Sequence, residues 1–365
     1  MNKKYDIAVV IGRFEPFHNI HKQLVDKALE LGEKVVLLLG TAKVAPDPKN
    51  PFTVDFRTAM IQSCYHGEDR KRLNFNGLRD KPYNEALWLA EAQNIIREYQ
   101  DDIIIEKNIE YTDVTYHAAL GQVKVALVGY EKDNTSYYIH KFPQWTLEHF
   151  NGNTPEGKVL NATDIRKMYF EDDRYEHLVP PEVGTLLHSF KSTQTYIDLK
   201  QEYSFTKQYK ADTRFVNAPY DPIFNTTDAV LVCNGHVLLV KRGFNPGRGL
   251  WALPGGFLQS DLWILDNAIK ELREETKIKV SSERLRNSLK GFHVFEYPYR
   301  SLRGRTVTFG HYFELESDDE LPTISRRGGD DAAGARWIPI SSLPDYEDKF
   351  FEDHFEIINH FIRRG

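Results

Sequence analysis

Short aliphatic runs alternate with amphipathic stretches through the first half of the chain. Continuous apolar runs of this length suit strands that are covered on both faces. They predict strands at 5–11, 34–39 and 123–128. Helical spacing predicts helices at 18–31, 57–64, 85–96 and 183–190. We therefore expect an α/β domain with a parallel sheet, which binds its ligands at the carboxyl ends of the strands.

The second half has a different pattern. Two apolar runs, 224–232 and 236–241, are separated by Asn234-Gly235, the residue pair most typical of a tight hairpin. Further strands are predicted at 289–297, 305–315 and 335–340. A helix carries its apolar stripe on Leu265, Ile269 and Leu272. We expect an α+β domain that is rich in antiparallel strands.

The stretch 191–212 is polar and shows no clear period, so we place the join between the domains there. The expected limits are 1–192 for the first domain, 193–212 for the linker and 213–365 for the second domain. The length of 365 residues agrees with two domains at roughly 150 residues each.

The amino-acid composition and the net charge argue against several classes of function. The chain has 41% hydrophobic and 27% charged residues, which is typical of a globular protein. A formal net charge of −6 argues against wholesale binding to nucleic acid or to an anionic membrane. The two cysteines, Cys64 and Cys233, are expected to be free thiols in a reducing, cytoplasmic compartment. No signal segment and no apolar run of spanning length is found.

The first candidate site is the loop Gly12–His21, which joins the first strand to the first helix. Helix N-termini bind phosphate through free backbone N–H groups. His18 and His21 are three residues apart on the first turn, so both can donate to one phosphate. Two surface histidines without a ligand would fit the same pattern, whereas a zinc site is disfavoured because no further ligand lies nearby.

A second cluster opens a later helix at 160–166, with Asn161 or Thr163 as the expected cap. The Thr163 hydroxyl and the Arg166 guanidinium, one turn apart, could form another anion cradle. Many helices start in this way, so the cluster has little weight by itself.

Together these segments resemble the nucleotidyltransferase superfamily, with its His-x-Gly-His turn and its Ile-Ser-x-Thr-x-x-Arg helix start. Over residues 5–190 the chain is similar to the archaeal-type nicotinamide mononucleotide (NMN) adenylyltransferases. Further support comes from 50–53 with Arg57, from Trp88 and from 127–133. Ile20 replaces the glycine between the two histidines, and Leu160-Asn161 replaces Ile-Ser. A cytidylyltransferase of lipid or cofactor synthesis is disfavoured by Trp88 and the 50–57 stretch.

The resemblance implies a Rossmann-like parallel sheet and the transfer of AMP from ATP to NMN, which yields NAD and pyrophosphate. His18 and His21 would hold the ATP phosphates, Thr163 and Arg166 the β and γ groups, and Mg²⁺ the remaining charge. Trp88 would stack on the nicotinamide ring, although a core tryptophan is an equal alternative. The remaining residues expected to bind substrate are Gly12, Arg13, Phe14, Gly129, Lys132 and Asp133.

The second half carries three glutamates, Glu271, Glu274 and Glu275, at positions i, i+3 and i+4 of one predicted helix. Like charges on one face repel, so a bound cation would stabilise them, although a solvated acidic face is the alternative. The stretch resembles the Nudix box, with Gly256, Glu271, Leu272, Glu274, Glu275 and Ile278 in register. Three positions depart from the box, namely Leu262, Lys270 and Lys277. The expected metal site is Gly256 with the three glutamates, and Mg²⁺ or alternatively Mn²⁺ is the expected metal.

The Nudix resemblance beside an adenylyltransferase implies ADP-ribose as the substrate. Arg300, Arg303 and Arg305 could bind its phosphates, and Asp330 or Asp331 could act as general base. Strand packing is favoured over adenine stacking for three aromatic residues, Phe292, Phe295 and Tyr297. The alternative function is an adenylyltransferase whose catalytically weak Nudix domain senses nucleotides, which the loss of the box's first glutamate at Leu262 supports. The sequence leaves the oligomeric state undetermined, and residues 350–364 are a candidate interface between copies of the chain.

Overall fold

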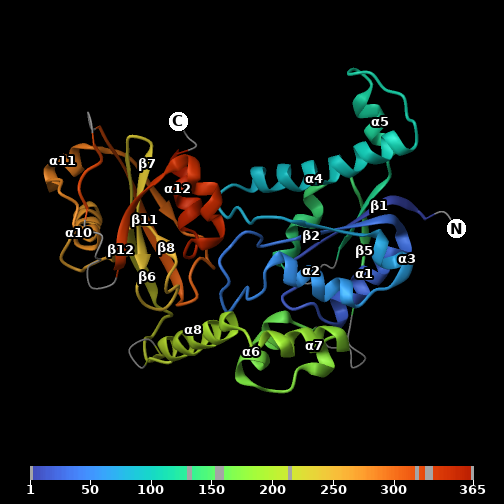
Figure 1. The fold of residues 1–365 in the computed structure, drawn as a ribbon, viewed down its shortest axis with the longest axis horizontal. Coiled ribbons are helices and arrows are strands. Elements are labelled where there is room, and N and C mark those ends of the chain that lie inside the picture. The colour runs from blue at the N-terminus through green and yellow to red at the C-terminus, as the bar shows by residue number, and fades with distance from the viewer. Residues whose placement is uncertain are drawn as a thin grey trace. The chain divides into compact units, whose positions relative to one another are not determined.

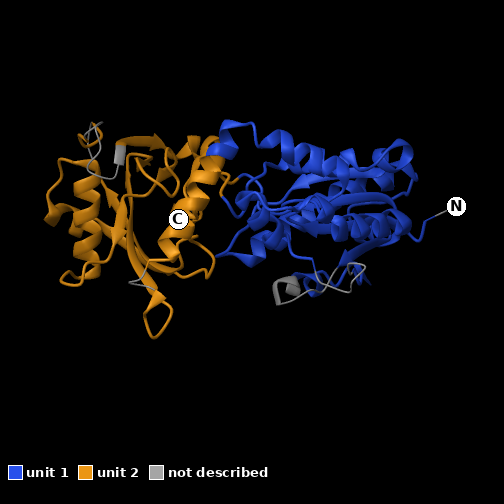
Figure 2. Cartoon of the chain, turned by 90° about the horizontal axis from the view of Figure 1, so that it is seen from below, with its two compact units in different colours: residues 1–43, 48–197 blue, residues 44–47, 198–365 orange. Residues whose placement is uncertain are grey.

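The computed structural model describes residues 3–129, 134–152, 160–212, 216–316, 320–324 and 332–362. The chain divides into two compact units, shown in different colours in Figure 2. The N-terminal unit comprises 1–43 and 48–197, and the C-terminal unit comprises 44–47 and 198–365. The division at 197/198 falls inside the stretch where the sequence placed the join.

The N-terminal unit is built on a five-stranded sheet in the order β3-β2-β1-β4-β5, and every described pair is parallel. Its strands are β1 (Tyr5–Gly12), β2 (Gly32–Leu39), β3 (Leu73–Gly77), β4 (Val125–Gly129) and β5 (Thr146–His149). Residues of β1 are buried whichever way they point, because helices cover both faces of the sheet. Ile7 and Val9 pack with Ile96 of the long helix, while α1 packs on β1 from the other side. The predicted α/β architecture is confirmed (Figure 1).

The helices of this unit include those that the sequence pattern predicts, and α3 and α5 in addition. They are α1 (Asn19–Leu31), α2 (Val54–Ser63), α3 (Gly67–Arg72), α4 (Glu85–Glu106), α5 (Tyr116–Gln122), α6 (Ala162–Glu171) and α7 (Pro181–Phe190), with 3₁₀ segments η1 (Asn134–Lys141) and η2 (Glu176–Leu178). The predicted helix at 85–96 extends ten residues further, to Glu106. Its second half is held by Ile103 and Ile104, which are buried in the core.

The polar stretch 191–212, in which the sequence shows no clear period, is largely the helix α8 (Gln194–Lys210). Three side chains of α8, those of Tyr196, Leu199 and Thr206, are buried. The Tyr196 ring stacks on Phe170 at a centroid distance of 5.8 Å, so the start of α8 packs in the N-terminal unit. The apolar stripe escaped the sequence analysis because a tyrosine and a threonine form most of it.

The C-terminal unit has a mixed sheet in the order β10-β11-β6-β7-β12, with β8 paired to β7 and β9 paired to β6. Its strands are β6 (Ile223–Cys233), β7 (His236–Arg242), β8 (Trp251–Ala252), β9 (Gly255–Phe257), β10 (Leu289–Phe295), β11 (Arg305–Leu315) and β12 (Ala332–Pro339). β6 and β11 are parallel, and the other described pairs of the sheet are antiparallel. The hairpin at Asn234-Gly235 is confirmed, with φ of 45° and 71°.

Helices cover both faces of this sheet (Figure 1). They are α10 (Ile264–Thr276), α11 (Ser282–Asn287) and α12 (His354–Ile362), with the 3₁₀ segment η3 (Ile340–Lys349). On one face Ile269 and Leu272 of α10 pack in a core with Phe313. On the other face Phe361 of α12 lies against Phe295, at a centroid distance of 5.7 Å.

Both cysteines are free, with Cys233 buried and Cys64 half-buried. Among the described helices, none combines the length and the hydropathy that crossing a bilayer needs.

Candidate active sites

The loop after β1 presents two stacked imidazole rings at the start of α1. The His21 backbone N–H donates to His18 Nδ1 at 3.3 Å, and the His18 N–H donates to His21 Nδ1 at 3.4 Å. The ring centroids are 3.5 Å apart. Because each Nδ1 accepts a hydrogen bond, each neutral ring carries its own proton on Nε2. The reciprocal cap therefore selects the tautomer in which both residues offer an Nε2–H donor.

Arg57 of α2 ties this loop to the loop after β2. Its side chain is 1% exposed. It donates to the carbonyl oxygens of Arg13 at 2.7 Å and Gly40 at 2.6 Å, and it pairs with Glu15 at 3.4 Å. Buried carbonyl and carboxylate oxygens satisfy the guanidinium, so the backbone around Arg13 is held in place.

The second motif reaches the same loop from the other end of the domain. Asn161 caps α6 by accepting the Thr163 N–H at 3.1 Å. Arg166 donates to the Glu15 carbonyl, and it also donates to the Thr163 hydroxyl at 3.1 Å. Glu15 and Arg166 are 151 residues apart in sequence, and this contact brings the predicted Thr-x-x-Arg cluster to the histidine loop.

Trp88, on the second turn of α4, lies near the carboxyl end of β1. Its ring meets Tyr138 edge-on at 5.9 Å, and the Tyr138 hydroxyl donates to the carbonyl of Ile11 at 3.0 Å. Trp88 is only partly buried, so it is not enclosed in the core.

Close packing explains the glycine at the end of β1. A Cβ on Gly12 would lie 2.9 Å from the ring of Phe14, which is buried and has a φ of +56°. Gly129 likewise ends β4. Lys132 and Asp133, which the sequence also assigned to substrate binding, lie outside the described residues.

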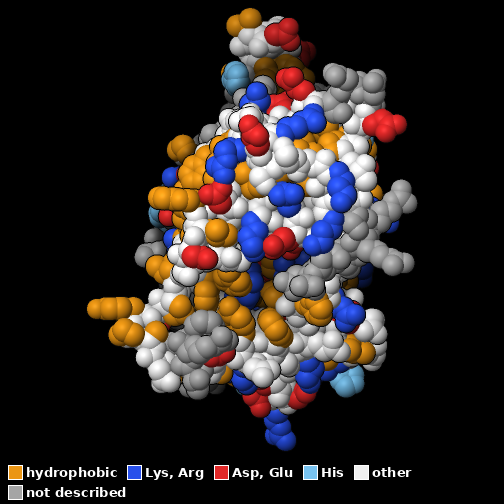
Figure 3. All heavy atoms as spheres, turned by 90° about the vertical axis from the view of Figure 1, so that its left-hand side faces the viewer, with side chains coloured by type: hydrophobic (Ala, Val, Ile, Leu, Met, Phe, Trp, Pro, Cys, Tyr) orange, Lys and Arg blue, Asp and Glu red, His pale blue; other side chains and the backbone are white. Residues whose placement is uncertain are grey.

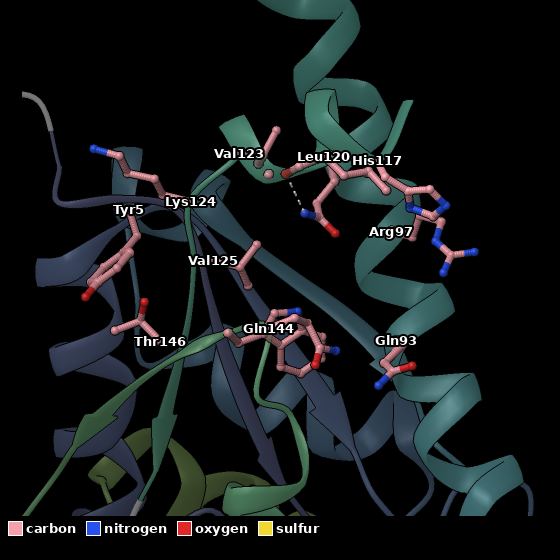
Figure 4. Close-up of a pocket in the computed structure, with 13 residues that line it drawn as sticks. Tyr5, Gln93, Arg97, His117, Leu120, Val123, Lys124, Val125, Gln144 and Thr146 are labelled. Atoms are coloured by element: carbon pink, nitrogen blue, oxygen red, sulfur yellow. Dashed lines mark hydrogen bonds between the residues drawn. The ribbon is translucent and has the colours of Figure 1, made fainter. Parts of the chain in front are cut away.

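A cavity of about 600 Å³ lies at the amino-terminal ends of the strands of the same sheet, away from the histidine loop (Figure 4). It is bordered by the amino-terminal residues of three strands, Tyr5, Val125 and Thr146. None of the predicted site residues lines it. Cavity size alone therefore does not identify the predicted site.

In the C-terminal unit, β9 meets the glutamate face of α10. The Gly255 N–H donates to a Glu275 carboxylate oxygen at 3.1 Å. A Cβ on Gly256 would lie 2.8 Å from the Glu271 carboxylate, so only glycine lets this side chain approach the strand. These contacts draw Glu271 and Glu275 to Gly255 and Gly256 of β9.

The Glu275 carboxyl group has a strongly raised pKa. Burial, together with the nearby charges of Glu271 and Asp228, raises its pKa to about 8, against the lowering effects of the Gly255 hydrogen bond and of Arg242. A positive charge beside this buried group would stabilise its ionised form.

The third glutamate of the motif has a different environment. The Glu274 side chain is 55% exposed and pairs with Lys270 at 2.9 Å, and the same ammonium lies 3.8 Å from Glu271. In the described part of the chain, no group of three or more His, Cys, Asp or Glu side chains is arranged to hold a metal ion. Two of the predicted metal ligands thus approach one another, while Glu274 is paired with Lys270.

The three arginines of the 300–305 segment have separate partners. Arg300 is buried and forms a bidentate ion pair with Asp353 at 2.9 and 2.7 Å; burial lowers the pKa of Arg300, but the Asp353 carboxylate outweighs it and the pKa is raised. Arg303 lies over the Phe257 ring at 5.4 Å, and Arg305 pairs with Glu296 at 3.7 Å. Asp330 and Asp331 lie outside the described residues.

Two positions in this domain differ from expectation. Phe295 is buried, as strand packing predicts, but Phe292 and Tyr297 are 51% and 37% exposed.

Sequence analysis also missed Asp228, which is 5% exposed on β6 and accepts a hydrogen bond from the Thr308 hydroxyl. An aspartate inside the apolar run of β6 was the available signal.

Comparison with known proteins agrees with this division. The family model "Cytidylyltransferase-like" matches residues 9–168, and the model "NUDIX domain" matches residues 224–361. Nicotinamide/nicotinic acid mononucleotide adenylyltransferase of Acinetobacter baylyi is 30% identical over 200 residues, covering 55% of this chain and 94% of that protein. ADP-ribose pyrophosphatase of Methanocaldococcus jannaschii is 30% identical over 138 residues, covering 37% of this chain and 71% of that protein.

One of the solved structures to which the chain is similar spans both halves. It is a bifunctional NMN adenylyltransferase/ADP ribose pyrophosphatase from Francisella tularensis, complexed with AMP and a manganese ion. It is 34% identical, covers 99% of each chain and superposes with a TM-score of 0.83. The chain therefore belongs to the family of bifunctional NMN adenylyltransferase/ADP-ribose pyrophosphatases, with its adenylyltransferase-like motifs in the first half and its Nudix motif in the second.

Proposed function

We propose that the N-terminal half transfers AMP from ATP to NMN, and that the C-terminal half hydrolyses ADP-ribose to AMP and ribose 5-phosphate. The observation that carries the first activity is the contact of Arg166 with the Glu15 carbonyl. It joins two motifs from opposite ends of the domain at the carboxyl end of a parallel sheet, where such folds bind nucleotides.

In the first reaction, an oxygen of the NMN 5′-phosphate attacks the α-phosphorus of ATP. The bond from that phosphorus to the bridging oxygen breaks, and pyrophosphate leaves with the electron pair. This chemistry needs alignment and charge stabilisation more than a nucleophilic side chain. The Nε2–H groups of His18 and His21 would donate to phosphate oxygens as charge develops, and Thr163 and Arg166 would hold the β and γ groups.

The remaining residues would shape the pocket. Trp88 would stack on the cationic nicotinamide ring, supported by its edge contact with Tyr138. The other substrate-binding residues that we propose are Gly12, Arg13, Phe14, Gly129, Lys132 and Asp133. The substrates of this half are thus ATP and NMN, and its product is NAD.

The Nudix residues suit a divalent cation. A buried carboxyl group with a pKa raised to about 8, beside a second carboxylate, is the donor set that a hard cation stabilises. We propose that Glu271 and Glu275 bind Mg²⁺ or Mn²⁺ with the Gly256 backbone, and that Glu274 joins them when it releases Lys270. When bound, the cation would polarise the pyrophosphate and acidify water.

In the second reaction, the oxygen of water attacks one phosphorus of the pyrophosphate. The bond from that phosphorus to the bridging oxygen breaks, the other phosphate leaves with the electron pair, and the protons of water are released to solvent, so that AMP and ribose 5-phosphate form. Arg303 and Arg305 are the cationic groups that we propose for the phosphates. Arg300 is already paired with Asp353, so we propose that it acts by holding this segment in place.

We also propose domain limits of 1–192 and 213–365, joined through 193–212. Their support is the division of the chain at 197/198. A cytoplasmic location is supported by the two free cysteines.

Two incubations of the full chain test the function. One supplies ATP, NMN and Mg²⁺ and follows NAD, and the other supplies ADP-ribose with Mg²⁺ or Mn²⁺ and follows AMP. His21→Ala should impair only the first activity and Glu275→Gln only the second, so each variant is the folding control for the other. Tight ADP-ribose binding without AMP release would favour the nucleotide sensor, which the Lys270–Glu274 ion pair also fits.

A further inference from the structure

The cavity at the amino-terminal ends of the N-terminal sheet has no part in the proposed mechanism, and we call it the amino-end cavity. Its volume of about 600 Å³ is in the range of small-molecule sites. Helices α4 and α5 form one side, and the first residues of β1, β4 and β5 form the other (Figure 4). The Gln100 side chain of α4 donates to the Leu120 carbonyl of α5 at 3.3 Å, which holds the two helices together.

The charged side chains that line the amino-end cavity are cationic. They are Arg97 of α4 and Lys124, which directly precedes β4, and His117 of α5 is a further donor. Among the described residues that line the cavity, none is an aspartate or a glutamate. Within the described part of the chain, no carboxylate pairs with the Arg97 guanidinium or the Lys124 ammonium. Both groups are therefore available to an anion that accepts several hydrogen bonds.

Three carboxylates near the lining residues already have partners. Asp6 pairs with Lys107, and Glu148 pairs with Lys4 at 2.6 Å. Asp101 accepts a hydrogen bond from a tyrosine hydroxyl at 2.6 Å. Because cations offset two of these three charges, the potential inside the cavity is set mainly by its own lining.

A groove in the other unit shows the contrast. It lies along α10 with a volume of about 690 Å³, and Figure 3 shows that side of the unit, where acidic side chains stand among lysines and arginines. Asp266 and Glu274 line this groove, and Glu274 pairs with Lys270 at 2.9 Å. Its cations are partly neutralised, so we expect it to attract an anion less strongly than the amino-end cavity does.

Neutral polar side chains complete the lining of the amino-end cavity. Gln93 and Gln144 each offer an amide donor and an amide acceptor, and Thr146 offers a hydroxyl. Such groups match the hydroxyls of a sugar, which both donate and accept. Cations for a phosphate beside amides for hydroxyls are the combination that a sugar phosphate requires.

One wall of the cavity leads to the residue that we propose for nicotinamide stacking. Trp145 lines the cavity and is 7% exposed. Its ring stacks on Phe142 at a centroid distance of 4.4 Å and an angle of 9°, and the Phe142 ring lies 6.2 Å from that of Trp88. Arg97 is on the same helix as Trp88. A ligand in the cavity is thus connected to Trp88 through a single intervening ring and through α4.

We propose that the amino-end cavity binds a sugar phosphate, with Arg97 holding the phosphate, and that the bound ligand strengthens the binding of NMN. The binding site stands by itself, whereas the regulation rests on the proposed function and on the role of Trp88 in it. A ligand that orders the Trp145 wall spares NMN part of the cost of ordering Trp88, which is positive cooperativity. The coupling is reciprocal, so NMN strengthens sugar-phosphate binding by the same factor.

Calorimetric titration of the full chain with ribose 5-phosphate in EDTA tests the site. Arg97→Gln should raise the dissociation constant about 10-fold, because a charge-assisted hydrogen bond to phosphate is lost. Arg70→Gln removes an exposed arginine from α3 of the same unit and should leave the constant unchanged. Ribose, which lacks the charge, and inorganic phosphate, which lacks the hydroxyls, should both bind more weakly than ribose 5-phosphate.

Two further variants separate this cavity from the sites already described. His21→Ala and Glu275→Gln alter those two sites and should bind ribose 5-phosphate as the wild type does. Loss of binding in either variant assigns the ligand to that site and overturns the cavity as its location. Equal affinity of Arg97→Gln and the wild type, or no binding to the wild type, also overturns it.

Steady-state NAD formation tests the regulation. Saturating ribose 5-phosphate should lower the KM for NMN about 5-fold in the wild type and should have no such effect in Arg97→Gln at the same concentration. An unchanged KM for NMN, with ribose 5-phosphate bound, overturns the regulation. A wild type that makes no NAD contradicts the proposed function instead, and Arg97-dependent binding of ribose 5-phosphate then still supports the site.

Discussion

Replacing Glu275 with glutamine should have opposite effects on stability and on catalysis. In the metal-free protein, burial beside Glu271 raises the Glu275 pKa from 4.5 to about 8. Between these two values the unfolded chain has released this proton and the folded chain has kept it. Stability from this group is therefore fully present below pH 4.5 and falls as the pH rises towards 8. Glutamine does not titrate, and its side-chain oxygen can still accept the Gly255 N–H.

The size of the effect follows from the shift. One pKa unit corresponds to 1.36 kcal/mol, so the full shift sets a ceiling of about 5 kcal/mol above pH 8. Allowing for relaxation around the charge, we expect Glu275→Gln to stabilise the metal-free domain by about 2 kcal/mol at pH 8. For a domain of this size that raises Tm by about 4–8 °C. Near pH 4.5 the variant and the wild type should unfold together.

Scanning calorimetry of the full chain in EDTA at pH 5 and pH 8 measures this, and Mn²⁺ identifies the transition of the Nudix domain. Mn²⁺ should stabilise the wild type more than the variant, because a cation binds the ionised carboxylate. The variant should also lose most ADP-ribose hydrolysis. The matched control is Glu274→Gln, whose exposed side chain should contribute less than about 0.5 kcal/mol without metal. Equal or lower stability of Glu275→Gln at pH 8 would refute the reasoning.

Three further outcomes are expected. His21→Ala should lower NAD formation from ATP and NMN about 10²- to 10³-fold with unchanged circular dichroism, since it removes one phosphate donor; wild-type turnover would contradict this role. A fragment of residues 1–197 should make NAD, whereas 1–192 should show a lower Tm because it lacks the buried Tyr196 ring; equal Tm values would show that α8 does not support this unit. Leu262→Glu should raise AMP release from ADP-ribose if the altered Nudix box is a weakened enzyme, and no change would favour the sensor.

Local sequence patterns were sufficient to predict most of the secondary structure. The apolar runs of β1, β2 and β4 and the Asn234-Gly235 hairpin are confirmed, because each depends on burial or turn chemistry within a few residues. The helix that the sequence patterns missed, α8, was missed because its burial does not depend on local pattern alone. Helix α8 has a stripe of tyrosine, leucine and threonine, and its Tyr196 ring is buried against a partner, Phe170, that lies outside the helix in the sequence.

The sequence by itself also determined which residues carry the candidate chemistry, because each motif is contiguous. Only the tertiary structure decided how they meet. The contact of Arg166 with Glu15 closes a loop of 151 residues, and the reciprocal cap of His18 and His21 selects their tautomer. Helical spacing placed three glutamates on one face, but packing against β9 drew in Glu271 and Glu275 and left Glu274 with Lys270. Burial and hydrogen bonding depend on neighbours that are distant along the chain, so a linear pattern cannot contain them.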